Sequence, residues 1–302
     1  MKASFQGAVA VLTFAAMAGA GTPANITHAE ENAAVSQSQQ ALENSPLVPI
    51  LRRGNVEDVL EGLKNLMNSP AFATLQEEEL IGVAFGFGYA AKEKKELSGQ
   101  ALELLNQFYE KIKNDGTSYV VKSILDNMAE TAYADKKLTI KVLTLLQPIV
   151  ELDSHTSIRS KAVQHAGDLG LSQHGRPDNS AAALAAINKA LGDRDEKIRQ
   201  KVAFWNGLLG MQGGKQVQEL AISTLAVLLK DSDSVVRRQA ADSISNTAVY
   251  EGRSDEVQHL LEPLLRDEDA EVRHEAENDL AQIKQNTGMR TKSRRLQLSP
   301  AP

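Results

Sequence analysis

The feature that most constrains the fold of this chain is a seven-residue pattern, Asp-x-Asp-x-x-(Val/Ile)-Arg, that returns along the sequence. Full copies end at Arg199, Arg237 and Arg273, and a weaker copy ends at Arg159. Successive copies lie 40, 38 and 36 residues apart. A period of this length indicates a repeat array, in which each unit buries its apolar side against its neighbours. Such an array determines an architecture and leaves the identity of any partner open.

The acids and the arginine of this pattern have a structural use. An acidic side chain just before a helix can accept hydrogen bonds from the first N–H groups, and its charge suits the positive end of the helix dipole. The arginine then lies one turn inside the helix, within reach of an aspartate on its own or the adjacent repeat. We predict that these residues, here called the signature, hold the repeats together. The signature comprises Asp153, Arg159, Asp193, Asp195, Arg199, Asp231, Asp233, Arg237, Asp267, Asp269 and Arg273.

Apolar residues recur at helical spacing around the signatures, and no stretch has the alternation of a strand. We predict six helical pairs over residues 46–286. Their expected bounds are 56–67 with 77–91, 97–113 with 117–134, 138–150 with 154–171, 181–191 with 196–211, 216–230 with 234–250, and 256–266 with 270–284.

The run Leu-Leu-x-Asp-x-Asp-x-x-Val-Arg-x-x-Ala resembles HEAT repeats, including the HEAT-like repeats common in bacterial proteins. The resemblance is strong over 181–284, moderate over 138–171 and weak before that. It implies an all-α fold, a right-handed α-solenoid of about six HEAT-like helical hairpins. It also implies that the aspartates end the turn between two helices and that the arginines open the second helix. His155 in place of an acid and Lys122 in place of an arginine depart from the pattern.

Residues 1–29 are organised like a secretory signal peptide. Lys2 precedes an apolar run over 8–20, and small residues follow. The run is too short and too rich in Gly and Ala for a secure membrane span, so we expect no transmembrane span in the mature chain. We expect cleavage before Gly21 or Glu30 and export to the periplasm or the medium. Residues 30–45 are polar and are predicted to be a flexible lead-in.

Charge is distributed unevenly along the chain. The net charge is −6, but residues 30–286 carry −11 and residues 287–302 carry +4. Nucleic-acid binding needs a basic surface that displaces counterions, so we expect no nucleic-acid partner. We predict that residues 287–302 form a basic disordered tail, which could contact an anionic surface. The absence of cysteine excludes a disulfide, a thiolate nucleophile and a Cys-ligated zinc.

No set of catalytic residues stands out in the sequence. The histidines are scattered, and none forms a His-x-x-x-His or His-Glu-x-x-His metal pair. A Walker loop and a Gly-x-Ser-x-Gly elbow are also missing. A Gly-rich segment at Gly82, Gly86 and Gly88 follows no strand, so we interpret it as a close approach between helices. We therefore predict no catalytic, cofactor-binding or metal-binding residues, no cofactor, and a protein that is not an enzyme.

A small basic and aromatic cluster is the candidate binding site. Lys161 and His165 lie 2 and 6 residues after Arg159, and Lys201 and Trp205 lie at the same distances after Arg199. Equal offsets in adjacent repeats place these pairs side by side, where they could take an acidic peptide, with Trp205 as the main contact. In the alternative, both rings fill gaps between the repeats.

The function predicted from the sequence is that of an exported, non-catalytic HEAT-repeat scaffold or adaptor, whose partner is a protein or a peptide. Two alternatives stay open at this point. One is a HEAT-like lyase or chaperone that acts on a chromophore or a modified protein, and the other is a host-directed effector. The first rests on analogy at the level of the fold, which does not establish a function. In the second, the leader and the basic tail would serve delivery.

Overall fold

The computed structural model describes residues 47–51, 55–114, 116–171, 177–251 and 253–298. In these residues all regular structure is helical, and no strand occurs. The chain divides into two compact units, unit 1 up to Val142 and unit 2 from Leu143, with the boundary inside helix α8 (Thr139–Leu152). The predicted signal peptide, 1–29, and lead-in, 30–45, lie outside the described residues.

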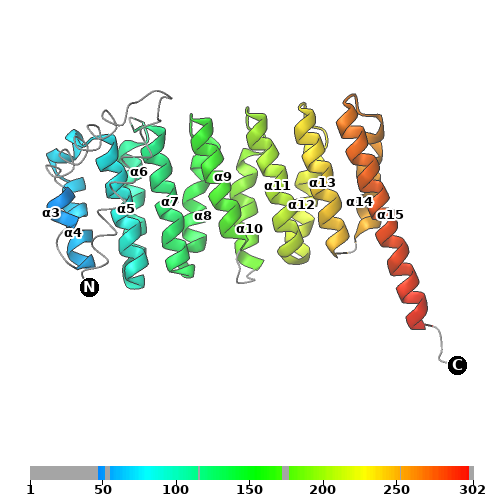
Figure 1. Ribbon diagram of the computed structural model, residues 1–302, viewed down its shortest axis with the longest axis horizontal. Coiled ribbons are helices and arrows are strands. Elements are labelled where there is room, and N and C mark those ends of the chain that lie inside the picture. Colours follow the sequence, from blue (N-terminus) through cyan, green and yellow to red (C-terminus); the bar gives the residue numbers. More distant parts are fainter. Residues whose placement is uncertain (1–46, 52–54, 115, 172–176, 252, 299–302) are drawn as a thin grey trace, which may run out of the picture. The chain divides into compact units, whose positions relative to one another are not determined.

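Unit 1 is a set of helices in which each packs against its neighbours in sequence (Figure 1). Two of its second helices, α5 and α7, also contact each other, so the hairpins form two layers. The helices of unit 1 are α3 (Leu47–Leu51), α4 (Val56–Met67), α5 (Glu77–Glu93), α6 (Ser98–Ile112) and α7 (Ser118–Ala134), with short 3-10 turns at Pro70–Thr74, Lys95–Leu97 and Lys136–Leu138.

Unit 2 continues the same plan with more regular repeats. Its second helices pack in the order α9, α11, α13 and α15, and the first helices cover one side of this layer. The helices are α9 (Thr156–Gly170), α10 (Pro177–Ile187), α11 (Glu196–Gln212), α12 (Gly214–Leu228), α13 (Ser234–Glu251), α14 (Ser254–Leu261) and α15 (Ala270–Leu298), with 3-10 turns at Asn188–Ala190 and Glu262–Arg266.

The predicted all-α stack of helical hairpins is confirmed, and most predicted bounds agree with the structure to within a few residues. One helix is shorter than expected. Helix α14 ends at Leu261 and a 3-10 turn follows, because Pro263 has no N–H to continue the helical hydrogen bonds.

The structure corrects the prediction for the C-terminal end of the chain. Helix α15 continues to Leu298, so residues 287–298 of the predicted disordered tail are helical, while 299–302 lie outside the described residues. Residues 289–298 are mostly Met, Arg, Lys, Leu and Gln, which favour helix, and the next proline is Pro300. The tail was predicted to be disordered because it has no sustained apolar period, but the helix propensity of the same residues was the better guide.

The Gly-rich segment of α5 lies where helices approach closely. A Cβ added to Gly86 would come within 2.4 Å of Leu63 on α4, and one added to Gly88 would come within 2.0 Å of Asn127 on α7. Both distances are far shorter than van der Waals contact. The interpretation of this segment as a close approach between helices is therefore confirmed.

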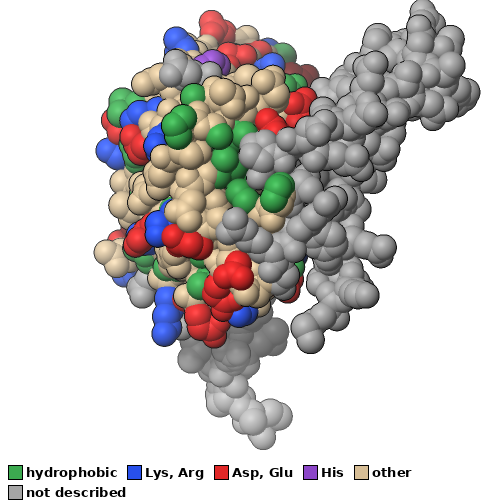
Figure 2. Space-filling view, turned by 90° about the vertical axis from the view of Figure 1, so that its left-hand side faces the viewer, with side chains coloured by type: hydrophobic (Ala, Val, Ile, Leu, Met, Phe, Trp, Pro, Cys, Tyr) green, Lys and Arg blue, Asp and Glu red, His purple; other side chains and the backbone are tan. Residues whose placement is uncertain are grey.

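The surface of unit 1 that is turned to the viewer in Figure 2 has mixed charge. Lysine and arginine side chains are scattered singly among acidic ones, and no continuous basic area is visible among the described residues of this face. Among the described residues, no helix combines the length and the apolar character that a membrane span requires.

Candidate functional site

The signature residues of unit 2 form a ladder of hydrogen bonds between adjacent repeats. Arg159, Arg199 and Arg237 each donate two parallel bonds to the first aspartate of the next repeat, which is the strong bidentate geometry for this pair. The Nε–Oδ2 distances are 2.7 Å for Arg159–Asp193, 2.7 Å for Arg199–Asp231 and 2.8 Å for Arg237–Asp267. The corresponding Nη2–Oδ1 distances are 2.9, 2.8 and 2.7 Å.

The remaining nitrogen of each arginine binds the turn of its own repeat. Nη1 of Arg237 donates to the carbonyl oxygen of Asp231 at 2.8 Å, and the other three signature arginines make the equivalent bond. The Asp231 carboxylate accepts the N–H of Asp233 at 2.9 Å. Asp233 in turn caps α13 by accepting the N–H of Val235 at 2.9 Å. The first three of these arginines therefore connect their own turn to the turn of the next repeat, and Arg273 binds its own turn alone.

The ladder is largely shielded from water. The side chains of Arg159 and Asp193 are 4% and 5% exposed. The hydrogen bond from Arg237 outweighs burial and holds the pKa of Asp267 below its ordinary value. Because these groups bind one another within the stack, the geometry supports a structural role for the signature.

Positions counted from the signature arginine describe how the second helices pack. A Cβ added to Gly167, at +8 on α9, would lie 2.1 Å from the ring of Trp205, at +6 on α11. A Cβ added to Gly207, at +8 on α11, would lie 2.7 Å from Ser243, at +6 on α13. Position +6 therefore points at the preceding second helix, against the residue at its position +8.

Trp205 is consequently a core residue, and the prediction that it contacts a partner was wrong. Its side chain is 3% exposed. The ring occupies the space that Gly167 leaves open between α9 and α11. The structure thus shows the alternative, in which the ring fills a gap between repeats.

The other members of the predicted cluster stay near the surface. Lys161 at +2 and His165 at +6 lie on α9, Lys201 at +2 lies on α11, and all three are half-buried. With Trp205 inside the stack, these residues do not form the predicted basic and aromatic cluster around an exposed indole ring.

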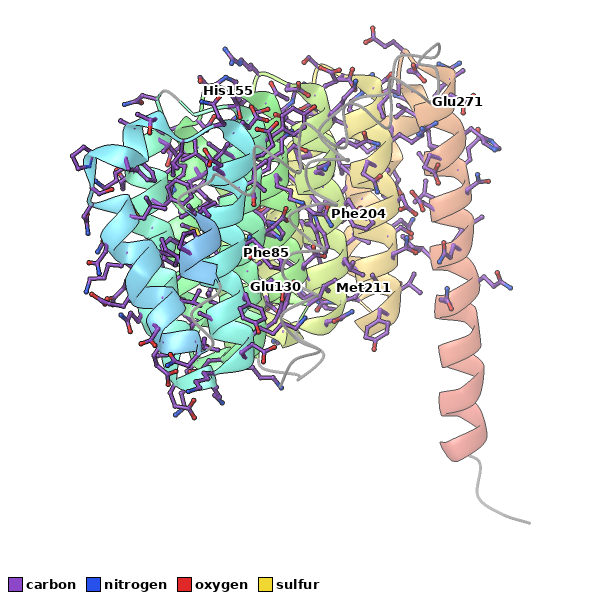
Figure 3. The ribbon with its side chains drawn as sticks, turned by 60° about the vertical axis from the view of Figure 1, so that its left-hand side comes forward. Phe85, Glu130, His155, Phe204, Met211 and Glu271 are labelled. Atoms are coloured by element: carbon purple, nitrogen blue, oxygen red, sulfur yellow. The ribbon has the colours of Figure 1, made fainter. Side chains whose placement is uncertain are left out.

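An apolar stripe on α11 was missed in the sequence analysis. Phe204, at +5, is 46% exposed, and Leu208 and Met211 follow at +9 and +12 and are half-buried. Spacings of three and four residues place these side chains and Lys201 on one side of the helix. Figure 3 shows Phe204 and Met211 along this helix. We call Lys201, Phe204, Leu208 and Met211 the α11 stripe.

The aromatic residue of the stripe is held in place by the core. The rings of Phe204 and Trp205 meet edge to face, with 5.2 Å between their centroids. This is a favourable arrangement for two aromatic rings. The signal in the sequence was the spacing of Phe204, Leu208 and Met211, which we did not separate from the core spacing of the same helix.

The seam between α13 and α15 contains a buried acid. Asp279 occupies position +6 on α15, equivalent to Trp205 and Ser243, and is 3% exposed. Burial, followed by the negative charge of Glu275, raises the pKa of Asp279 to about 7, while the hydroxyl of Ser245 opposes the shift. Ser245 is at +8 on α13, so the packing of +8 against +6 recurs here with two polar side chains.

Two further acids lie beside Asp279. Asp242, Glu275 and Asp279 each place a carboxylate oxygen within 4.8 Å of the others. In the described part of the chain, this is the one group of three such side chains that could share a metal ion. The sequence analysis named no metal-binding residues, because the three acids are 33 and 4 residues apart and match no motif.

The raised pKa of Asp279 predicts a pH dependence of stability. The native chain holds a proton on Asp279 up to about pH 7, whereas the unfolded chain releases it near 3.8. The free energy of unfolding should therefore fall as the pH rises between these values and then level off. Asp279→Asn should remove this decline and gain a few kcal/mol at neutral pH, since one pKa unit corresponds to about 1.4 kcal/mol. Urea unfolding across this pH range, with EDTA present, measures the free energy of unfolding of both proteins. The same pH dependence of this free energy in the two proteins would contradict the prediction.

One family model and two solved structures are similar to this chain. A family model described as HEAT repeats matches residues 184–281. Among solved structures, one crystal structure of an engineered protein is 19% identical, with 80% of this chain and 96% of that chain covered and a TM-score of 0.42. A second crystal structure of an engineered protein is 16% identical, with 91% and 78% covered and a TM-score of 0.38. The search of curated proteins found no match. Residues 184–281 therefore match HEAT repeats, and this range contains most of the aspartate–arginine ladder.

Proposed function

We propose that the chain is an exported HEAT-repeat scaffold that binds a protein or peptide partner and has no catalytic role. The observation that carries the proposal is the α11 stripe. Its aromatic ring is exposed on a helix whose opposite side is fully packed, and two further apolar side chains extend the surface along the helix. Buried aromatic anchors contribute much of the binding energy at protein interfaces, and this ring has the exposure to become one.

The stripe also indicates the kind of segment that would bind. Phe204, Leu208 and Met211 offer an apolar strip about two helical turns long, and methionine adapts easily to the shape of a partner. Lys201 adds a positive charge at one end of this strip. An extended segment or a helix with apolar side chains and an acidic residue at one end fits this surface.

Export is supported by the order of residues at the start of the chain. Lys2, the apolar run over 8–20 and the small residues after it follow the pattern of a secretory signal peptide. The intact mass of the native protein is the measurement. A mature chain that begins at Gly21 or Glu30 agrees with the proposal, and a retained Met1 contradicts it.

Replacing Phe204 with alanine is expected to reduce partner binding by about tenfold or more, because loss of a central aromatic contact costs about 2 kcal/mol or more. The partner is first captured by the native chain from the source organism and identified by mass spectrometry. Its affinity for the purified variants is then measured by calorimetry.

A matched control for this test lies on a first helix. Val227 on α12 is 56% exposed, more than Phe204, but it is on the other layer of the stack. Val227→Ala should bind like the wild-type chain. A partner that tolerates Phe204→Ala and is lost with Val227→Ala would place the binding surface on the first helices and contradict the proposal.

A further inference from the structure

The acids in the seam between α13 and α15 have the form of a small site with a floor and a rim. Asp279 forms the floor and is 3% exposed. Asp242 from α13 and Glu275 from α15 are half-buried at positions +5 and +2 and form the rim. Their carboxylate oxygens come within 4.8 Å of one another and of the Asp279 carboxylate. Two helices thus contribute to one cluster, and two of its three side chains are partly exposed.

The negative charge of this cluster is not balanced by protein groups. Among the described residues, none of the three carboxylates forms an ion pair with a lysine, arginine or histidine, and Arg238 pairs instead with Glu271 at 3.6 Å. Asp242 Oδ1 accepts a hydrogen bond from Asn246 Nδ2 at 2.7 Å. Oδ2 of Asp279 is buried and has no hydrogen-bond partner within the described part of the chain. A buried acceptor without a partner is costly, so a ligand at this atom would lower the free energy of the native state.

Three acids at these positions occur only where α15 packs against α13. The same positions in the other interfaces between second helices carry different residues. The seam between α9 and α11 has Gln164, Lys201 and Trp205 at these three positions, and the seam between α11 and α13 has Phe204, Gln239 and Ser243. The repeat therefore does not require acids there. All three positions are acidic only where α15 meets α13.

We propose that Asp242, Glu275 and Asp279 bind a calcium ion between α13 and α15. Two oxygens on one calcium ion lie no more than about 5 Å apart, because calcium–oxygen distances are about 2.3–2.6 Å. The separation in the structure meets this limit. Three carboxylates suit calcium better than magnesium, which prefers one or two carboxylates and keeps most of its water. Water at the half-exposed rim completes the coordination.

The ion would act where the aspartate–arginine ladder ends. Arg273 binds the carbonyl oxygens of Asp267 and Glu268 with Nη1. In the described residues no further repeat follows α15, so no aspartate of a next turn pairs with it. A calcium ion shared by Asp242 of α13 and two acids of α15 supplies an added connection between the last two second helices. Binding therefore stabilises the end of the stack through mass action on the native state.

Calorimetry on the EDTA-stripped full chain tests the proposal, with calcium, magnesium and manganese chloride as separate titrants. We expect one calcium ion per chain, with binding complete below about 1 mM and weaker binding of magnesium. Calcium should also raise the melting temperature measured by circular dichroism. Asp279→Asn should weaken calcium binding by about tenfold or more, because it removes a charged ligand. The matched control is Glu277→Gln, which removes an exposed charge from the same helix and should bind calcium like the wild-type chain.

Three results would overturn the calcium site. The first is that the wild-type chain binds no calcium up to about 1 mM. The second is that Asp279→Asn and the wild-type chain bind calcium with equal affinity. The third is that the chain binds manganese and neither of the other two metals. The dichroism of Asp279→Asn in EDTA shows whether it folds. Should it not fold, the double variant Asp242→Asn with Glu275→Gln replaces it, since both of its sites are at the rim. Calcium affinity of the folded double variant equal to that of the wild-type chain would overturn the proposal as well.

Discussion

Replacing Trp205 with alanine is expected to lower the free energy of unfolding by about 3–5 kcal/mol, the range for large-to-small changes of buried aromatic residues. The ring lies so close to Gly167 that a Cβ there would come within 2.1 Å of it. Alanine would leave the space of the ring empty, and the packed helices can close it only in part. We expect the lower half of the range. The reason is that Trp205 Nε1 is buried without a hydrogen-bond partner in the described structure. Removing this unsatisfied donor offsets part of the lost packing energy.

The matched control for Trp205 is its neighbour in the sequence. Phe204 is 46% exposed, and Phe204→Ala should cost about 1 kcal/mol or less. Urea unfolding followed by circular dichroism suits both variants, because the chain has one tryptophan and fluorescence would be lost in one of them. Equal losses of stability in the two variants would show that Trp205 is not the core residue described above.

Arg237→Ala is expected to lower the free energy of unfolding by about 3 kcal/mol or more, because it leaves the carboxylate of Asp267 buried without its partner. The variant loses two bonds to Asp267 and one each to the carbonyl oxygens of Asp231 and Ser232. Both side chains of the pair are 9% exposed, so water replaces the lost bonds poorly. Urea unfolding measures the loss.

The adjacent arginine provides the control for this second variant. Arg238 is 41% exposed and lies 3.6 Å from Glu271, so Arg238→Ala should change stability by less than about 1 kcal/mol. Adding Asp267→Asn to Arg237→Ala should restore part of the loss, since the buried charge disappears together with its partner. Equal unfolding curves for Arg237→Ala and Arg238→Ala would contradict the structural role of the ladder.

The ladder could be anticipated from the sequence because its information is local and periodic. The pattern Asp-x-Asp-x-x-(Val/Ile)-Arg sets the offset of Arg237 from Asp231, and the period of 36 residues places Asp267 at the position of Asp231 in the next repeat. Capping and charge pairing follow from these offsets. The helical hairpins could be predicted for the same reason.

The binding face could not be anticipated in the same way. Adjacent helical residues differ by about 100° in direction, so the offset alone does not tell which of Phe204 and Trp205 faces the neighbouring helix. That choice depends on how α9 packs against α11. Gly167 at +8 carried a usable signal, since its missing side chain makes room for the ring of Trp205 in the next repeat.

The acidic seam was missed because its residues are distant in sequence. Asp242 and Asp279 come from different repeats. Taken alone, each is an acid of the kind found on an ordinary solvent-exposed helix face. Only the packing of α13 against α15 brings them together. The offsets +5, +2 and +6 now define the position that any such cluster would take in another seam of this chain.

The most direct test of the central claim compares Phe204→Ala and Trp205→Ala in partner affinity and in melting temperature, with affinity expressed per folded molecule. The claim is that the α11 stripe binds the partner, while position +6 holds the stack together. It predicts that Phe204→Ala melts close to the wild-type chain and loses the partner, and that Trp205→Ala melts well below it and, where folded, still binds. Wild-type affinity in Phe204→Ala, together with lost affinity in folded Trp205→Ala, would contradict the claim.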